Sequence, residues 1–163
     1  MELVPYTQDD LALTEAIECD EEMMKDLGGA WPKEAIPETH RKRLAFIAGG
    51  SWWLKIVPEP GGPAAGTIGI WPMEWKGEPA HEMGWMVLPA FQGRGLASGA
   101  GRLILERARA DGRFRRIHAF PGAANAASNA ICRKLGFARL ENSEIDYAGR
   151  RLPCVHWRLD LRP

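Results

Sequence analysis

The sequence predicts a mixed α/β fold in which helices flank one central sheet. Short runs of β-branched and aromatic residues indicate strands, while longer segments repeat apolar residues at helical spacing. Glycine- and proline-rich turns separate these segments, so that the predicted elements follow the order βααβββαβαββ. Because strands and helices alternate only in the second half, we expect a mixed sheet rather than an all-parallel one.

The first half of the chain begins with two helices. After a short strand at residues 2–5, Thr7 is followed three residues later by Asp10, a capping-box pattern that predicts a helix over residues 9–19. Pro37 is typical of a first helical turn and predicts a second helix, which Gly49 and Gly50 end. Three strands follow, the first two paired across the turn EPGGPAAG, at residues 52–57 (WWLKIV), 67–73 (TIGIWPM) and 81–88 (HEMGWMVL).

The second half alternates helices and strands. Apolar residues at helical spacing predict a helix that begins at Gly95 and ends before Gly112, where glycine is typical of a helix C-terminus. A strand at residues 116–120 precedes a helix over residues 125–135, which Gly136 and a following apolar residue end as a Schellman-type stop. Two final strands are expected at about residues 138–145 and 151–161.

Composition is that of an ordinary globular domain. The chain has 163 residues, 45% hydrophobic and 26% charged, and is interpreted as a single domain over residues 1–163. Its formal net charge is zero, which argues against a general nucleic-acid or membrane-surface role. Three cysteines without a CxxC pattern indicate neither a disulfide framework nor a metal site, and a cytoplasmic protein is expected.

The stretch PAFQGRGLASG, residues 89–99, connects a predicted strand to a predicted helix. Such a turn suits an anion, because the first N–H groups of a helix are unpaired and glycines let a phosphate approach them. Ser98 breaks the dinucleotide pattern G-x-G-x-x-G, and no Gly-Lys-Ser/Thr ending marks a triphosphate loop, which disfavours a nucleotide-binding domain. Gln92, Gly95 and Ala97 instead fit the pattern Q/R-x-x-G-x-G/A.

With this loop the chain resembles the GNAT superfamily of acetyl-CoA-dependent N-acetyltransferases. A second segment, residues 125–137 (NAASNAICRKLGF), is similar to the family pattern N-x-x-S-N-x…G-F, in the form found in ribosomal-protein N-terminal acetyltransferases. The resemblance covers residues 82–137 well and implies a GNAT-like, mostly antiparallel sheet of about seven strands. It further implies acetyl-CoA as co-substrate, an amine as acceptor and a homodimer.

The resemblance also implies where the cofactor lies. Backbone N–H groups from Gln92 to Ala97 would hold the pyrophosphate, and the side chain of Arg94 can add a charge-assisted contact. The pantetheine arm would pair with the strand at residues 86–88 and hydrogen-bond Asn125. The expected cofactor-binding residues are therefore Met86, Val87, Leu88, Gln92, Gly93, Arg94, Gly95, Leu96, Ala97, Asn125 and Ser128.

Amide formation from a thioester requires a base for the amine, donors for the oxyanion and a proton for the leaving thiolate. Glu82 is the candidate base, because its apolar neighbours in HEMGWMV raise a carboxyl pKa. His81 is its rival, since neighbouring strand residues face opposite ways and only one can point into the site. Ser128 is the candidate acid, on a polar arc of the helix at residues 125–135. Many family members carry a tyrosine for this role, which is missing here, so the proton donor is Ser128, water or none.

The acceptor site is expected to combine aromatic and acidic side chains. Trp71, Trp75 and Trp85 are interpreted as an aromatic wall for a cationic amine, with at least one of them in the core. Residues 40–43 (HRKR) are expected to form a solvated helix face. Tyr147 is expected at the rim of the acceptor site. The acidic side chains expected to supply negative charge there are Asp20, Glu21, Glu22, Glu74 and Glu78.

The leading hypothesis is an N-acetyltransferase in which the amine attacks acetyl-CoA directly within a ternary complex. The acceptor would be a protein N-terminus or a small-molecule amine, with no nucleic-acid or membrane partner. The alternative is a non-catalytic acyl-CoA-binding or regulatory module of the same fold, which the missing tyrosine keeps open.

Overall fold

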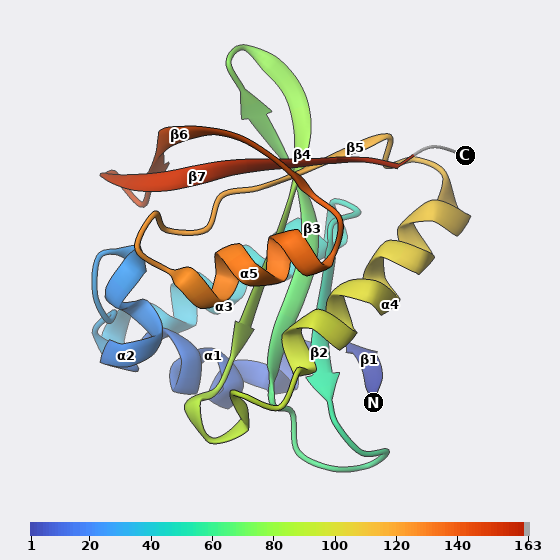
Figure 1. Cartoon of the computed structure of the whole chain (residues 1–163). Coiled ribbons are helices and arrows are strands. Elements are labelled where there is room, and N and C mark those ends of the chain that lie inside the picture. The colour runs from blue at the N-terminus through green and yellow to red at the C-terminus, as the bar shows by residue number, and fades with distance from the viewer. Residues whose placement is uncertain (162–163) are drawn as a thin grey trace.

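A twisted seven-stranded sheet forms the centre of the computed structural model, which describes residues 1–161 (Figure 1). The strands lie in the order β1-β2-β3-β4-β5-β7-β6, and β4 with β5 is the parallel pair among antiparallel neighbours. The predicted mixed, mostly antiparallel sheet is therefore confirmed. Its strands are β1 (Glu2–Pro5), β2 (Trp52–Val57), β3 (Gly66–Trp75), β4 (Glu78–Val87), β5 (Arg116–Ala119), β6 (Ala138–Tyr147) and β7 (Arg150–Asp160).

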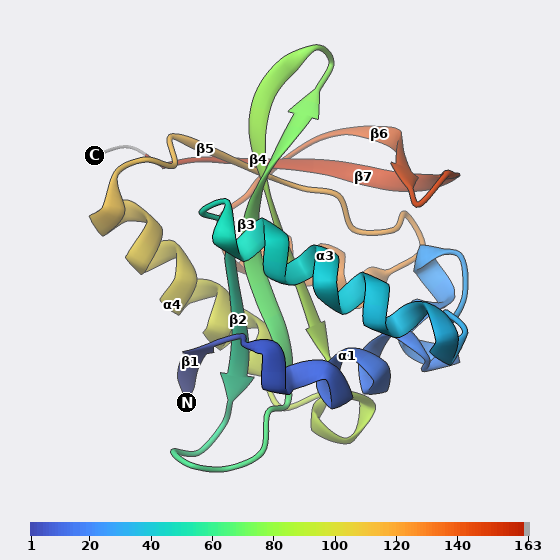
Figure 2. The ribbon, with the colours of Figure 1, turned by 180° about the vertical axis from the view of Figure 1, so that it is seen from behind.

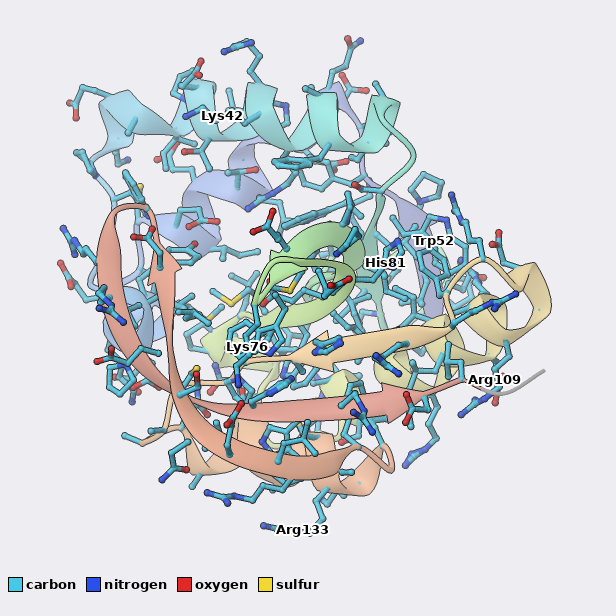
Figure 3. All side chains as sticks on the ribbon, turned by 90° about the horizontal axis from the view of Figure 1, so that it is seen from above. Lys42, Trp52, Lys76, His81, Arg109 and Arg133 are labelled. Carbon is cyan, nitrogen blue, oxygen red and sulfur yellow. The ribbon has the colours of Figure 1, made fainter. Side chains whose placement is uncertain are left out.

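Helices cover both faces of this sheet. In Figure 1, α4 (Leu96–Asp111) and α5 (Ala126–Lys134) lie in front, and Figure 2 shows α1 (Leu11–Glu18) and α3 (Ile36–Ala48) on the opposite face. The view along the sheet in Figure 3 separates the two layers, with Lys42 of α3 on one side and Arg133 of α5 on the other. None of the helices within residues 1–161 has the length and apolarity needed to cross a membrane.

Local sequence signals account for several helix ends. The predicted capping box forms, with the Thr7 N–H donating to Asp10 Oδ2 at 2.7 Å. Gly112 has the positive φ of 78° expected at a helix C-terminus. At the end of α5, the Phe137 N–H donates to the Cys132 carbonyl at 3.1 Å, which is the Schellman hydrogen bond.

Strands β3 and β4 are longer than the sequence predicts. They continue to a tight hairpin at Lys76 and Gly77, whose φ angles of 53° and 81° are typical of a type I′ turn. Pro72 and Pro79 are tolerated because each lies where its strand is paired on one edge only. Pro72 of β3 lies beyond Ile70, where the pairing with β2 ends, and Pro79 of β4 lies outside the pairing with β5. The sequence reading also missed α2 (Glu21–Met24), a single helical turn.

The sheet opens between β4 and β5. Their ladder contains one register pair, Glu82 opposite His118. Beyond it the chain after β5 turns to β7, where the Val155 N–H donates to the Pro121 carbonyl at 3.0 Å. Residues 83–87 of β4 therefore keep their ladder with β3 and have no strand from residues 1–161 on the other edge. The apolar core packs between the sheet and the helices α4 and α5.

Candidate active site

Three adjoining cavities follow the opening between β4 and β5. The first, here called the groove, has a volume of about 790 Å³ and lies between α5 and the loop after β4. The second, the chamber, has about 190 Å³ and shares with the groove Met23, Asp26, Trp85, Met86, Asn125 and Ser128. The third, the cleft, has about 480 Å³, is lined by α3 and the end of β6, and shares with the chamber Arg43, Trp53, Trp71, Glu82, Ile145 and Tyr147.

The loop at the start of α4 has the geometry of an anion site. Gly93 and Gly95 have φ angles of 73° and 74°, and the intervening residue has a negative φ, so successive N–H groups can converge on one point. Within residues 1–161, no backbone carbonyl accepts from the N–H groups of residues 93–98. A Cβ added at either glycine would meet nothing within 4 Å. The loop thus offers free donors, open space and the positive end of a helix dipole.

Gln92 fastens this loop to the end of β4. Its N–H donates to the Pro89 carbonyl at 3.2 Å, and its side-chain Nε2 donates to the Val87 carbonyl at 2.9 Å. The N–H is therefore already used within the protein, whereas the N–H of Ser98 is free. The free N–H groups therefore run from Gly93 to Ser98, whereas the sequence suggested donors from Gln92 to Ala97.

Most of the expected cofactor-binding residues line the groove: Met86, Val87, Gln92, Gly93, Gly95, Leu96, Ala97, Asn125 and Ser128. Leu88 and Arg94 are not among the lining residues. The Leu88 N–H donates to the Ala65 carbonyl at 2.8 Å, and the Arg94 guanidinium lies over the Phe91 ring, 5.8 Å from its centroid.

Helix α5 presents Ser128 to both the groove and the chamber. Asn125 caps this helix, because its Oδ1 accepts from the Ser128 N–H at 2.9 Å. Asn129, on the same polar arc, is held by the Gly122 carbonyl at 3.0 Å and by Trp157 Nε1 at 2.9 Å. Of the polar side chains on the arc, Ser128 is the one whose side chain makes no hydrogen bond among the described residues and lines the chamber.

Between the two candidate bases, the structure places Glu82 at the cavities. Glu82 lines the chamber and the cleft, and its Oε2 accepts from Trp71 Nε1 at 3.2 Å. Burial raises the pKa of Glu82 to about 7, against the effect of the Trp71 hydrogen bond. His81 lies on the other face, beside Trp52 in Figure 3, with its ring edge-on to Phe114 at 5.0 Å. At neutral pH Glu82 is therefore divided between its acid and carboxylate forms, which suits a general base.

The prediction of a solvated face at residues 40–43 is wrong for two of its four residues. His40 and Arg43 are 7% and 8% exposed. Arg43 Nη2 lies 2.7 Å from Glu18 Oε1, and the guanidinium lies 4.5 Å from the centroid of the Trp53 ring. The helical period held the missed signal, since His40 and Arg43 lie on the same stripe as the buried Ile36.

Aromatic side chains surround the cleft, as expected. Trp71 and Trp75 line it, whereas Trp85 lines the groove and the chamber instead. Tyr147 lines the chamber and the cleft, and its pKa is raised by burial and by the charges of Glu18 and Glu82. Trp53, which the sequence reading did not single out, stacks on Trp71 with ring centroids 4.8 Å apart.

Comparison with known proteins identifies the family. Residues 1–138 match the model of the acetyltransferase (GNAT) domain. The chain belongs to the GNAT acetyltransferase family. The predicted enzyme class, an acetyl-CoA-dependent acyltransferase, is thereby confirmed. No curated protein sequence matches the chain significantly.

Solved GNAT structures share this fold at low sequence identity. An acetyl transferase from Salmonella typhimurium, described as modifying the N-terminal serine of a 50S ribosomal subunit protein, is 17% identical, with a TM-score of 0.81 over 98% of this chain and 94% of that chain. Spermidine N-acetyltransferase from Vibrio cholerae is 13% identical, with a TM-score of 0.78 over 98% and 95%. An aminoglycoside acetyltransferase in complex with coenzyme A is 18% identical, with a TM-score of 0.77 over 97% and 93%. These likenesses establish the GNAT fold of the chain.

Proposed function

We propose that this GNAT protein transfers the acetyl group of acetyl-CoA to a primary amine by direct attack within a ternary complex. The position of Glu82 carries the proposal, because this one carboxylate lines both the chamber and the cleft. Coenzyme A would occupy the groove, with its pyrophosphate on the free N–H groups of residues 93–98 and its thioester in the chamber. The amine would enter through the cleft and meet the thioester beside Glu82.

The chemistry then proceeds in two steps. Glu82 accepts a proton from the amine as the amine nitrogen forms a bond to the thioester carbonyl carbon. The carbon–sulfur bond breaks, and the thiolate takes a proton from Ser128 or from water. A backbone N–H of Met86 or Val87 on the unpaired edge of β4 is the candidate for the oxyanion donor, since the Leu88 N–H is already bonded to the Ala65 carbonyl. Glu82 finally returns its proton to solvent, and Ser128, where it was the donor, regains a proton from solvent, so that acetyl-CoA and amine yield coenzyme A and amide.

A protein N-terminus is the favoured acceptor within the class of primary amines. The pattern of residues 125–137 is most similar to ribosomal-protein N-terminal acetyltransferases, and the Salmonella neighbour is described as modifying an N-terminal serine. Small-molecule amines are the second candidate, because the cleft is lined by Glu74, Glu144 and Asp146 beside its tryptophans. Spermidine and aminoglycoside acetyltransferases are among the neighbours of similar fold.

Release of coenzyme A thiol distinguishes an enzyme from a binding module. The protein is incubated with acetyl-CoA and a panel that contains peptides with free N-termini, polyamines and aminoglycosides, with N-acetylated peptides as the control. We expect amine-dependent thiol release, and acetylated peptide detected by mass spectrometry. If calorimetry shows tight binding of acetyl-CoA while no amine releases thiol above the hydrolysis background, the regulatory-module alternative is correct.

Gly95→Ala is expected to weaken acetyl-CoA binding about tenfold, the size of one lost hydrogen bond to a charged group. The methyl group would project into the open space beside the free N–H groups, at a residue with a φ of 74°. Gly112→Ala is the matched control, because Gly112 has a φ of 78°, equally open surroundings and a place at the far end of the same helix. Calorimetry with acetyl-CoA measures the effect. Equal affinities of the two variants would contradict the pyrophosphate assignment.

A further inference from the structure

We propose that Trp71 is the positioning residue for the Glu82 base, holding one carboxylate oxygen through its indole N–H and leaving the other to accept the proton of the amine. The inference rests on the proposed role of Glu82. It starts from the sheet register, in which Trp71 of β3 lies directly opposite Glu82 of β4. Residues opposite each other in a ladder point to the same face, so that the indole and the carboxylate meet above the sheet. The distance from Nε1 to Oε2 is 3.2 Å.

Two glycines let the indole ring lie close against the sheet. A Cβ at Gly84 would be 2.6 Å from Trp71 Cη2, and a Cβ at Gly69 would be 3.3 Å from Trp71 Cζ3. A side chain at Gly84 would push the ring away from the strands, whereas one at Gly69 would first meet the Trp52 carbonyl oxygen, 2.5 Å from its Cβ, and would crowd the ring as well. The absence of side chains at residues 69 and 84 is therefore part of what directs the indole N–H toward Glu82.

A stack on the same face of the sheet holds the ring in place. Trp53 stacks on Trp71 with an interplanar angle of 23°, and the Arg43 guanidinium lies against Trp53. Arg43 is fixed in turn by Glu18 Oε1 at 2.7 Å and by Thr14 Oγ1 at 3.2 Å. A chain of contacts thus runs from α1 through α3 and β2 to Trp71, and none of its members except Trp71 hydrogen-bonds Glu82 among the described residues.

The hydrogen bond from Trp71 and the burial of the carboxyl group shift the pKa of Glu82 in opposite directions. Burial favours the neutral acid, whereas the indole N–H favours the carboxylate. Loss of the N–H would leave burial alone and raise the pKa of Glu82 further. The titratable groups around this carboxylate include the Glu18–Arg43 pair from α1 and α3, Tyr147 of β6, Cys154 of β7 and His118 of β5. The two cavities that Glu82 lines add Asp26, Lys42 of α3, Glu74 of β3, and Glu144 and Asp146 of β6.

Trp71→Phe and Trp53→Phe form a matched pair. Both exchanges keep an aromatic ring in the same stack, but Trp53 Nε1 is buried without a hydrogen-bond partner among the described residues, whereas Trp71 Nε1 donates to Glu82. We expect Trp71→Phe to raise the pKa of Glu82 by about one unit and Trp53→Phe to leave it unchanged. A ¹³C NMR titration of the carboxyl groups measures this in the free protein, with the Glu82 signal assigned by its loss in Glu82→Gln.

The same shift is expected in catalysis. For Trp71→Phe, kcat/KM should fall about tenfold at pH 6 and approach the wild-type value at pH 9, since a base with a higher pKa is fully ionised only at higher pH. Gly84→Ala, which displaces the indole without removing it, should move the midpoint in the same direction. Far-ultraviolet circular dichroism verifies that each variant is folded.

The experiments distinguish a failure of the positioning role of Trp71 from a failure of the base assignment of Glu82. An unchanged Glu82 titration in folded Trp71→Phe, or an equal shift in Trp53→Phe, overturns the positioning role of Trp71 whatever the enzyme does. Full activity of Glu82→Gln overturns the base assignment, and the NMR titration, which needs no substrate, still reports on the hydrogen bond. A shift confined to Trp71→Phe and Gly84→Ala, in both NMR and kinetics, supports the inference.

Discussion

Replacing Glu82 with glutamine is expected to lower the rate of acetyl transfer about 100-fold at pH 7, the lower end of what a general base contributes. Glutamine is close in shape but cannot accept the amine proton. In the wild-type enzyme kcat/KM should rise with pH to a midpoint near 7, the pKa to which burial raises Glu82. In the variant this limb should disappear. The loss should shrink toward pH 10, because solution then deprotonates the amine unaided.

The control for this variant is Glu78→Gln. The sequence placed Glu78 among the acids of the acceptor site, but in the structure it is an exposed residue of the same strand and lines none of the three cavities. Its exchange should therefore leave the pH profile as it is. Acetyl-CoA affinity, measured by calorimetry, should be the same for Glu82→Gln and the wild type. Unaltered activity of Glu82→Gln, or a loss that is equal at all pH values, would show that Glu82 is not the base.

The stability of the same variant provides a second readout. The pKa of Glu82 is about 7 in the folded protein, against an ordinary value of 4.5, so folded Glu82 binds more protons than unfolded Glu82 between these values. The contribution of Glu82 to the free energy of unfolding of the wild type therefore decreases as the pH rises from 4.5 to 7. Above pH 7 the full cost of burying the charged carboxylate is present. Glu82→Gln should be more stable than the wild type by up to about 3 kcal/mol at pH 8, and much less so at pH 4.5. Urea unfolding at the two pH values measures the difference.

Arg43→Leu is expected to lower the free energy of unfolding by about 3–5 kcal/mol. The side chains of Arg43 and Glu18 are 9% and 4% exposed, and Glu18 Oε2 already lacks a hydrogen-bond partner within the part of the chain that the structure describes. Removal of the guanidinium would leave the Glu18 carboxylate buried with no counter-charge, and it would remove the cation that lies against Trp53. Such a loss is a large part of the stability of an ordinary domain.

Two further variants test the cause of this destabilisation. Arg43→Leu combined with Glu18→Leu removes both charges and should recover most of the loss, because an apolar pair can replace a buried ion pair at little cost. Arg41→Leu, two residues earlier on α3, breaks the exposed pair between Arg41 and Glu38 and should cost less than about 1 kcal/mol. Chemical denaturation of all four proteins measures the differences. A double variant as unstable as Arg43→Leu would exclude the unpaired charge as the cause.

Much of the groove was predictable because its parts are local in sequence. Residues 93–98 form one loop and one helical turn, and the free N–H groups follow from the backbone conformation that Gly93 and Gly95 allow. The Asn125 cap and the Gly136 stop of α5 likewise depend on residues within one or two turns. Such features need no knowledge of what packs against them.

The environment of Glu82 was not predictable in this way. Arg43 and Glu18 form an ion pair although they are 25 residues apart in the sequence, and Trp53 stacks on Trp71 from another strand. A run such as HRKR reads as a solvated face, and only the packing of α3 against α1 buries two of its residues. Nothing in the sequence around Trp71 shows that its N–H finds a carboxylate, because that contact depends on the register of β3 with β4.

The sequence by itself predicted the order of the elements except α2, the glycine loop before α4 and the likeness to the GNAT family, since each of these depends on neighbouring residues. It left His81 and Glu82 as the two candidates for the base, of which only one can face the site because adjacent residues of a strand point to opposite sides. Only the tertiary structure placed Glu82, and not His81, at the chamber and the cleft. The side of a sheet that holds a cavity depends on which helices cover each face and where two strands part, and both are set by contacts between residues far apart in the chain.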